Sequence, residues 1–155
     1  MTALHIYWDN ALNTGIDEID KQHKKLVDYI NELHVCITNG DIEGAQEIYK
    51  KLLEYTIEHF SFEEKMFNDY NYPLTEGHIG SHKQFVNMLT SYKERYDQNK
   101  DKKVLRELHG FLTNWLMSHI KKDDMAYVKD LLPKMQKKPI SSWLKKNLPS
   151  FFRKG

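Results

Sequence analysis

Cysteine, glycine and proline are scarce in this sequence, and long hydrophobic runs are absent. Of the 155 residues only Cys36 is a cysteine, so no internal disulfide can form, which agrees with a reducing compartment. No apolar run approaches the roughly 18 residues that a membrane span requires. With seven glycines, four prolines and 40% hydrophobic residues, the composition is typical of one soluble, helix-rich domain rather than of a disordered chain.

Basic residues are missing from the start of the chain, and acidic residues are missing from its end. Residues 1–10 contain no basic segment followed by an apolar stretch, so we expect no secretory signal and a cytoplasmic location. The last twenty residues carry six bases and no acid, whereas the rest of the chain has a net charge of −5. A mildly acidic body with a basic tail is not the charge pattern of a nucleic-acid-binding domain, so we expect no nucleic-acid partner.

Four stretches of the chain have the apolar periodicity of helices. Apolar residues recur in them at spacings of three and four, over residues 17–38, 42–70, 75–96 and 103–131. Asn39 and Gly40 supply a stop after the first stretch, Asp41 supplies an N-cap for the second, and Pro133 lies just beyond the fourth. Because the connections are short, the sequence predicts an all-α fold, an antiparallel up-down-up-down four-helix bundle with an N-terminal arm packed along it.

Each of the four apolar stripes contains at least one histidine. A single histidine of this kind is typically a core residue bonded to a backbone carbonyl, but that explanation weakens when every helix contributes one. His59 and Glu63 are four residues apart, so both point the same way, one helical turn apart. The same holds for His78 and His82. The inward-facing set of five imidazoles and at least two carboxylates is His23, His59, Glu63, His78, His82 and His119, with Asp123 and Asp124 following the last histidine.

This set of side chains points to a metal centre. Burying so many polar groups unpaired would be costly, and metal ions would satisfy them directly. Seven ligands are too many for one ion, carboxylates can bridge two ions, and imidazoles mixed with carboxylates suit iron, copper, zinc or nickel. The cysteine sets of structural zinc sites, the His-Glu-x-x-His motif and the paired Glu-x-x-His motifs of ferritin-like bundles are all absent from the sequence. The sequence therefore predicts a dinuclear transition-metal site, with iron as the preferred metal.

Four segments of the chain resemble successive blocks of the bacterial hemerythrins, and the similarity spans about residues 7–132. These segments are YWDNALNTGIDEIDKQHKKL, HFSFEEKMF, HIGSHKQF and WLMSHIKKDDMAY. The resemblance implies two irons. The positions that match the three-histidine iron of the family are His78, His82 and His119, and those that match the two-histidine iron are His23 and His59. Glu63 and Asp124 match the carboxylates that bridge the irons, beside an oxo or hydroxo group.

The acid after His119 can be assigned in two ways. Regular helix geometry favours Asp123, which lies four residues on, whereas the family pattern places the acid five residues on, at Asp124, with a tyrosine three residues later. We choose Asp124, expect a local distortion of the helix there, and keep Asp123 as the reserve candidate. Tyr127 matches the family tyrosine and is expected to hydrogen-bond a bridging carboxylate.

The resemblance implies that dioxygen binds at the two-histidine iron. Leu116 matches the family's pocket leucine, although an ordinary core leucine is the alternative. We expect reversible dioxygen binding for storage, delivery or sensing, and no enzymatic activity. The rival hypothesis is a redox enzyme at the same site, such as a ferroxidase, a peroxidase or a nitric oxide-handling protein. His5, His34 and His109 fall outside the motif and are interpreted as structural or surface residues.

The tail extends past the region of resemblance. We expect residues 1–135 to form the hemerythrin-like di-iron domain and residues 136–155 to form a basic amphipathic extension. Ile140, Trp143, Leu144 and Leu148 have helical spacing, with lysines between them and a proline after them. Such a segment either binds an anionic membrane surface or a partner protein, or folds back on the acidic bundle. An isolated helix of this length is not stable, and we favour docking on the bundle.

Overall fold

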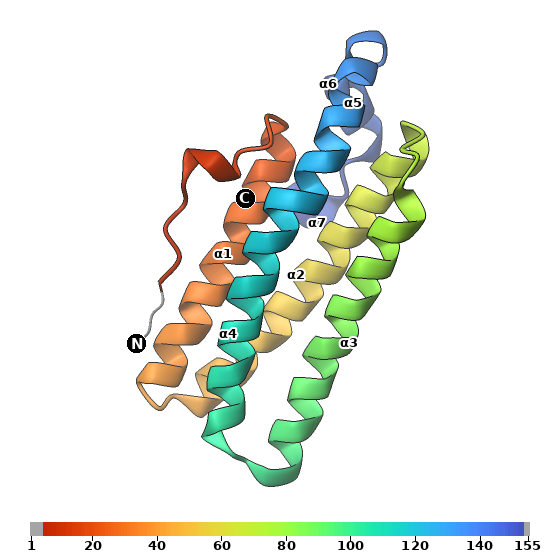
Figure 1. Ribbon diagram of the computed structural model, residues 1–155. Coiled ribbons are helices and arrows are strands. Elements are labelled where there is room, and N and C mark those ends of the chain that lie inside the picture. The colour runs from red at the N-terminus through yellow and green to blue at the C-terminus, as the bar shows by residue number, and fades with distance from the viewer. Residues whose placement is uncertain (1–4, 154–155) are drawn as a thin grey trace.

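The computed structural model describes residues 5–153, and long helices running side by side dominate it (Figure 1). The helices are α1 (Asp17–Thr38), α2 (Ile42–Asp69), α3 (Thr75–Asn99), α4 (Lys102–His119) and α5 (Met125–Lys137), with the short α6 (Ile140–Asn147) and α7 (Ser150–Arg153). In Figure 1, α1 and α3 run down the page whereas α2 and α4 run up it. Residues 5–153 contain no strand, and the predicted all-α helical bundle is confirmed.

The turns at the lower end of the bundle follow directly from the sequence. The Asp41 side chain accepts a hydrogen bond of 2.9 Å from the backbone N–H of Gly44, which caps α2 as predicted. Gly40 precedes it with φ 72°, a left-handed conformation that glycine adopts without strain. Asp101 caps α4 in the same manner through the N–H of Lys103. These local signals explain why the predicted limits of the first two helices lie within one residue of the observed ones.

The fourth stretch differs from the prediction because its helical structure continues beyond Pro133. A π-helical turn, Ile120–Asp124, joins α4 to α5, and α5 runs on to Lys137 with Pro133 inside it. A proline within a helix removes one backbone hydrogen bond. Leu131 and Met135 are both buried, so packing on either side of the proline holds the helix together. The prediction that Pro133 lies beyond the helix was therefore wrong.

Two large apolar clusters fill most of the bundle, one below the histidines and one above them, and a third, small cluster contains Tyr96, Val104 and Leu105. The lower cluster includes Leu33, Leu89 and Leu112, none of which is exposed. The upper cluster includes Phe67 and Tyr127, also fully buried. On α1 and α2 the predicted metal ligands lie between residues of the lower cluster and residues of the upper cluster. The site is therefore enclosed by apolar side chains at both ends.

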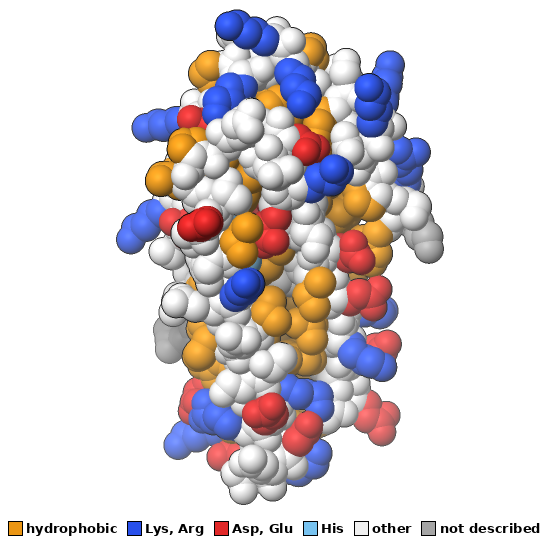
Figure 2. Space-filling model, turned by 90° about the vertical axis from the view of Figure 1, so that its right-hand side faces the viewer, with side chains coloured by type: hydrophobic (Ala, Val, Ile, Leu, Met, Phe, Trp, Pro, Cys, Tyr) orange, Lys and Arg blue, Asp and Glu red, His pale blue; other side chains and the backbone are white. Residues whose placement is uncertain are grey.

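The tail packs against the upper half of the bundle, behind α5 in Figure 1. Trp143 and Phe152 are buried in the upper cluster, and the indole N–H of Trp143 donates a 2.8 Å hydrogen bond to the Asp69 carboxylate. The structure thus has the docked arrangement, with the apolar side of α6 inward. The basic residues remain exposed, namely Lys137, Lys138, Lys145, Lys146 and Arg153. Lys and Arg side chains predominate at this end in Figure 2.

Docking also bears on the membrane alternative for the tail. The apolar anchors that a membrane surface would need, Trp143 and Phe152, are already in contact with Phe62 of α2. Only the exposed bases are free to meet an anionic partner, and such a partner stays a prediction. Within residues 5–153 no helix combines the length and the apolar character needed to cross a bilayer.

The N-terminal arm lies along α1 in Figure 1, as predicted. Asn31 of α1 holds it by two hydrogen bonds to the backbone of Ile6, of 2.8 and 2.9 Å. Leu12 of the arm is buried and belongs to the same apolar cluster as Leu33, so the arm contributes to the core of the bundle.

Candidate metal centre

All seven predicted ligands converge in the interior of the bundle. None is more than 6% exposed; they are His23, His59, Glu63, His78, His82, His119 and Asp124. Donor atoms of the five histidines and Glu63 form two groups, and within each group all atoms lie within 4.8 Å of one another. One group contains three histidines with Glu63, and the other contains two histidines with the same Glu63. This is the division that the resemblance implies, although metal binding by these residues stays a prediction.

The two carboxylates stand between the two groups of histidines. The Oδ2 atom of Asp124 lies 3.1 Å from Nε2 of His23, and its Oδ1 atom lies 3.2 Å from Nε2 of both His78 and His119. Asp124 therefore offers one oxygen to each group. The Oε1 atom of Glu63 lies 3.4 Å from Nε2 of His59 and 3.3 Å from Nε2 of His82. Both carboxylates are placed to bridge two ions.

Many of these donor atoms have no hydrogen-bond partner among the described residues. They are Nε2 of His23, His78, His82 and His119, Oε1 of Glu63, and both carboxylate oxygens of Asp124. Buried polar atoms without partners destabilise a fold, and so many in one place call for a ligand. Two donors bound at right angles to an ion about 2.1 Å away lie about 3 Å apart, which is close to the separations found here. The residues therefore fit a pair of metal ions.

The protonation states also suit metal binding. Burial lowers the pKa of His59 to about 4, even though Glu63 opposes this shift, so the imidazole is neutral at pH 7. Burial and Asp124 would raise the pKa of Glu63, but His59 and His82 hold it at about 2. Neutral imidazoles and ionised carboxylates are the forms that bind metal ions.

The π-helical turn places the two acids after His119 in different surroundings. A π-helical turn spans five residues, so it brings Asp124 onto the same side of the helix as His119. Asp124 is fully buried in the site, whereas the Asp123 side chain is 48% exposed. Oδ2 of Asp123 instead lies 2.9 Å from the outer nitrogen, Nδ1, of His119. The expected distortion is present, and Asp124 rather than Asp123 faces the interior.

Further side chains hold the ligands from outside. The Tyr127 hydroxyl donates a 2.8 Å hydrogen bond to Oε2 of Glu63, the contact expected from the sequence. Gln22 and Glu64 were not predicted: Oε1 of Gln22 lies 2.6 Å from Nδ1 of His59, and Oε2 of Glu64 lies 2.9 Å from Nδ1 of His82. Each is the chain neighbour of a predicted ligand. The rule that a metal-binding histidine donates its other N–H to an acceptor could have drawn attention to them.

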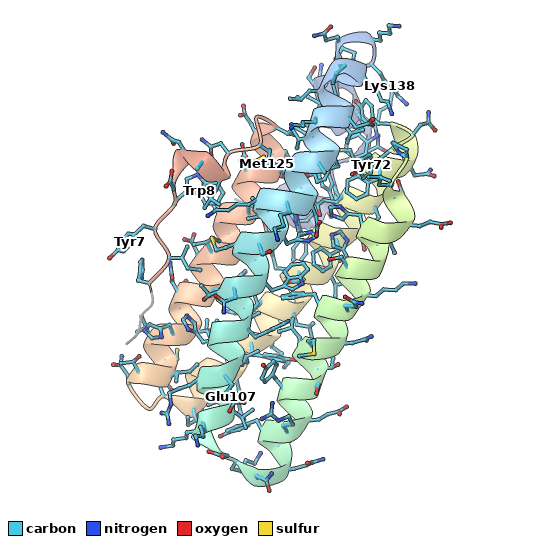
Figure 3. The ribbon with its side chains drawn as sticks, in the orientation of Figure 1. Tyr7, Trp8, Tyr72, Glu107, Met125 and Lys138 are labelled. Carbon is cyan, nitrogen blue, oxygen red and sulfur yellow. The ribbon has the colours of Figure 1, made fainter. Side chains whose placement is uncertain are left out.

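Aromatic rings pack directly on two of the histidines. Phe60 is stacked on His82 with ring centroids 3.7 Å apart, and Trp115 is stacked on His119 at 4.2 Å. Tyr72, labelled in Figure 3, lies in the upper cluster 6.3 Å from the Tyr127 ring. The imidazoles of the three-histidine group are thus fixed by packing as well as by hydrogen bonds.

A small cavity of about 10 Å³ adjoins the two-histidine group. Its lining includes His23 and His59, also His119 and Asp124, together with apolar side chains such as Leu116. Leu116 is 5% exposed and also belongs to the lower cluster. It is therefore both a core leucine and a residue that lines the cavity. A role in a ligand pocket stays a prediction.

Comparison with known proteins agrees with this geometry. A bacteriohemerythrin of Pseudomonas aeruginosa PAO1 is 35% identical over 152 residues, which is 96% of this chain and 98% of that protein. A bacteriohemerythrin of Stenotrophomonas maltophilia R551-3 is 34% identical over 95% of this chain and 97% of that protein. A crystal structure of a hemerythrin variant has the same fold, with a TM-score of 0.71 at 23% identity, over 80% of this chain and 95% of that chain. The family model described as the hemerythrin HHE cation binding domain matches residues 14–131, and the chain belongs to this family.

Proposed function

We propose that this protein binds dioxygen reversibly at a non-heme di-iron centre, for storage, delivery or sensing, and that it is not an enzyme. The observation that carries the proposal is the division of the buried donors into a three-histidine group and a two-histidine group that share Glu63. The relatives named bacteriohemerythrin support iron and dioxygen as the metal and the ligand.

The two groups would have different tasks. One ion would be held by His78, His82 and His119 through three nitrogens, and the other by His23 and His59 through two. The ion with fewer protein ligands would have room for dioxygen, and both of its histidines line the cavity. When bound, the two ferrous ions would each give one electron, and dioxygen would take up both. Tyr127 holds Glu63 in place by its hydrogen bond, and the apolar lining keeps water away.

Reversibility follows from the type of ligand and the lining of the cavity. Five neutral imidazoles donate less negative charge than the carboxylates of di-iron oxygenases, which favours binding over cleavage of dioxygen. Apart from the ligands, the cavity is lined by apolar side chains and the hydroxyl of Thr56. This lining would offer few protons to bound dioxygen. Reduced dioxygen would therefore leave the site slowly as superoxide or peroxide.

The test is repeated cycling of the iron-loaded protein between anaerobic and aerobic solution. The protein is reduced without oxygen, exposed to air, and returned to argon while its visible absorption spectrum is recorded. We expect an absorption band that appears and disappears over several cycles, with about two irons per chain throughout. Irreversible oxidation coupled to steady consumption of a reductant would establish the enzyme instead. Protein from iron-replete cells that contains one zinc and little iron would contradict the di-iron proposal.

Leu116 gives a second test of the proposed pocket. Leu116→Ala removes an apolar side chain that is not a predicted ligand, so water should reach the site and autoxidation should accelerate several-fold at equal iron content. Leu33→Ala is the matched control, because Leu33 is equally apolar and buried but lies in the lower cluster away from the cavity. Equal autoxidation rates in the two variants would remove Leu116 from the pocket.

A further inference from the structure

The outer nitrogens of the ligand histidines have different partners on the two sides of the centre. On the three-histidine side, Nδ1 of His82 lies 2.9 Å from a carboxylate oxygen of Glu64, and Nδ1 of His119 lies 2.9 Å from a carboxylate oxygen of Asp123. These acids come from α2 and from the π-helical turn, so they approach the three-histidine group from two different helices. Both side chains are partly exposed, Glu64 at 31% and Asp123 at 48%.

The two-histidine side has no corresponding carboxylate among the described residues. Nδ1 of His59 has the neutral amide oxygen of Gln22 at 2.6 Å, and Nδ1 of His23 is buried without a partner. The bridging carboxylates do not create this difference, because Glu63 belongs to both groups and Asp124 contacts histidines of both. The asymmetry in charge therefore lies in the outer partners.

A carboxylate that accepts the Nδ1–H of a metal-bound imidazole makes that imidazole a stronger electron donor. It also places a negative charge close to the ion, and both effects stabilise the ion in its higher oxidation state. We propose that Glu64 and Asp123 are positioning residues that make the three-histidine ion easier to oxidise than its neighbour. The inference rests on the proposed di-iron function and specifies which ion yields its electron first.

The Glu64 and Asp123 carboxylates are not needed to orient the His82 and His119 rings. His82 is stacked on Phe60 with an interplanar angle of 2°, and His119 is stacked on Trp115 at 15°. Oγ of Ser81 lies 3.5 Å from Nδ1 of His119 and is a second, weaker partner for it. Because packing fixes both rings, removing the negative charge should leave the geometry intact and change the electron donation of the imidazoles.

The test uses Glu64→Gln and Asp123→Asn, singly and together, since an amide keeps an acceptor oxygen but removes the charge. The potentials of the two one-electron steps of the iron-loaded protein are measured by spectroelectrochemistry, and dioxygen dissociation is measured by stopped flow. We expect two irons per chain in every variant. In the double variant the mean potential should be higher, the separation between the potentials of the two steps should be smaller, and dioxygen release should be faster by roughly tenfold. Gln22→Glu is the reciprocal variant, which adds a charge on the two-histidine side and should lower the mean potential while also narrowing the separation.

Unchanged potentials in the double variant at full iron content would overturn the inference. Loss of iron from the amide variants would overturn it too, because the acids would then hold the ion rather than tune it. The proposed function fails separately, if the unaltered protein does not bind and release dioxygen. The potentials remain measurable in that case, so the two failures are distinguishable.

Discussion

The lower and upper halves of the bundle are built differently. The lower half is closed by tight turns at Gly40 and Asp101, and its core contains leucines such as Leu33 and Leu112 that are completely buried. The upper half contains the polar cluster, the π-helical turn, a proline within α5 and a docked tail. The comparison shows that the lower half consists of regular helices only. The upper half contains irregular helix where the candidate metal ligands lie, and α6 and α7 add packing to it.

The largest effect should come from the bridging carboxylates. Glu63→Ala and Asp124→Ala should each abolish the dinuclear centre, since each carboxylate stands between both groups of histidines. Iron per chain is measured after aerobic purification. Asp123→Ala is the matched control and should keep about two irons, because Asp123 lies outside the site. Loss of iron from Asp123→Ala with retention in Asp124→Ala would reverse the assignment of the two acids.

A leucine of the lower half should affect stability and not iron. Leu33→Ala removes a fully buried side chain and should lower the free energy of unfolding by about 4 kcal/mol. Urea unfolding gives the free energy, and iron content per folded chain should match that of the unaltered protein. A fall in iron content equal to that of Asp124→Ala would show that the two halves are not separable.

The tail should stabilise the upper half. Trp143→Ala removes a buried indole and its hydrogen bond to Asp69, and should lower the free energy of unfolding by about 3 kcal/mol. Lys145→Ala, an exposed residue of the same helix, is the control and should have little effect. Truncation after residue 135 then asks whether residues 1–135 still fold and hold iron. Unaltered stability in Trp143→Ala would show that the tail is not part of the domain's core.

The smallest effect should appear as a pH dependence in the lower half. Burial, and to a lesser extent neighbouring His34, lowers the pKa of His109 from 6.5 to about 4, so the folded protein binds fewer protons there than the unfolded chain. The stability associated with neutral His109 is present above pH 6.5 and is lost as the pH falls toward 4. Between pH 7 and pH 5 the unaltered protein should lose about 2 kcal/mol more than His109→Gln in urea unfolding. Equal losses would show that His109 is not the titrating group.

The sequence predicts the lower half well because its signals are local. Asp41 caps a helix from one residue away, and apolar spacing alone identifies Leu33 and Leu112 as core residues. Six of the seven candidate ligands could also be found, since their spacing places them on inward faces, whereas Asp124 was identified only through the family pattern. Gln22 and Glu64 were missed, because which acceptor reaches each histidine depends on how closely α1, α2 and α3 approach one another. The helix through Pro133 was missed because packing around it outweighs the local preference.

The π-helical turn also has a consequence for the phase of the helix that contains it. Each residue of an α-helix advances about 100°, so Tyr127, eight residues after His119, would stand roughly 80° out of line with it. The turn absorbs one extra residue, and the inward stripe of α4 therefore continues in phase through Tyr127 and Leu131 of α5. The extra residue lets two consecutive acids reach opposite nitrogens of one imidazole, Asp124 at Nε2 and Asp123 at Nδ1 of His119. A helix shorter by one residue would keep the inward stripe, but its acids could not contact both nitrogens of the His119 ring.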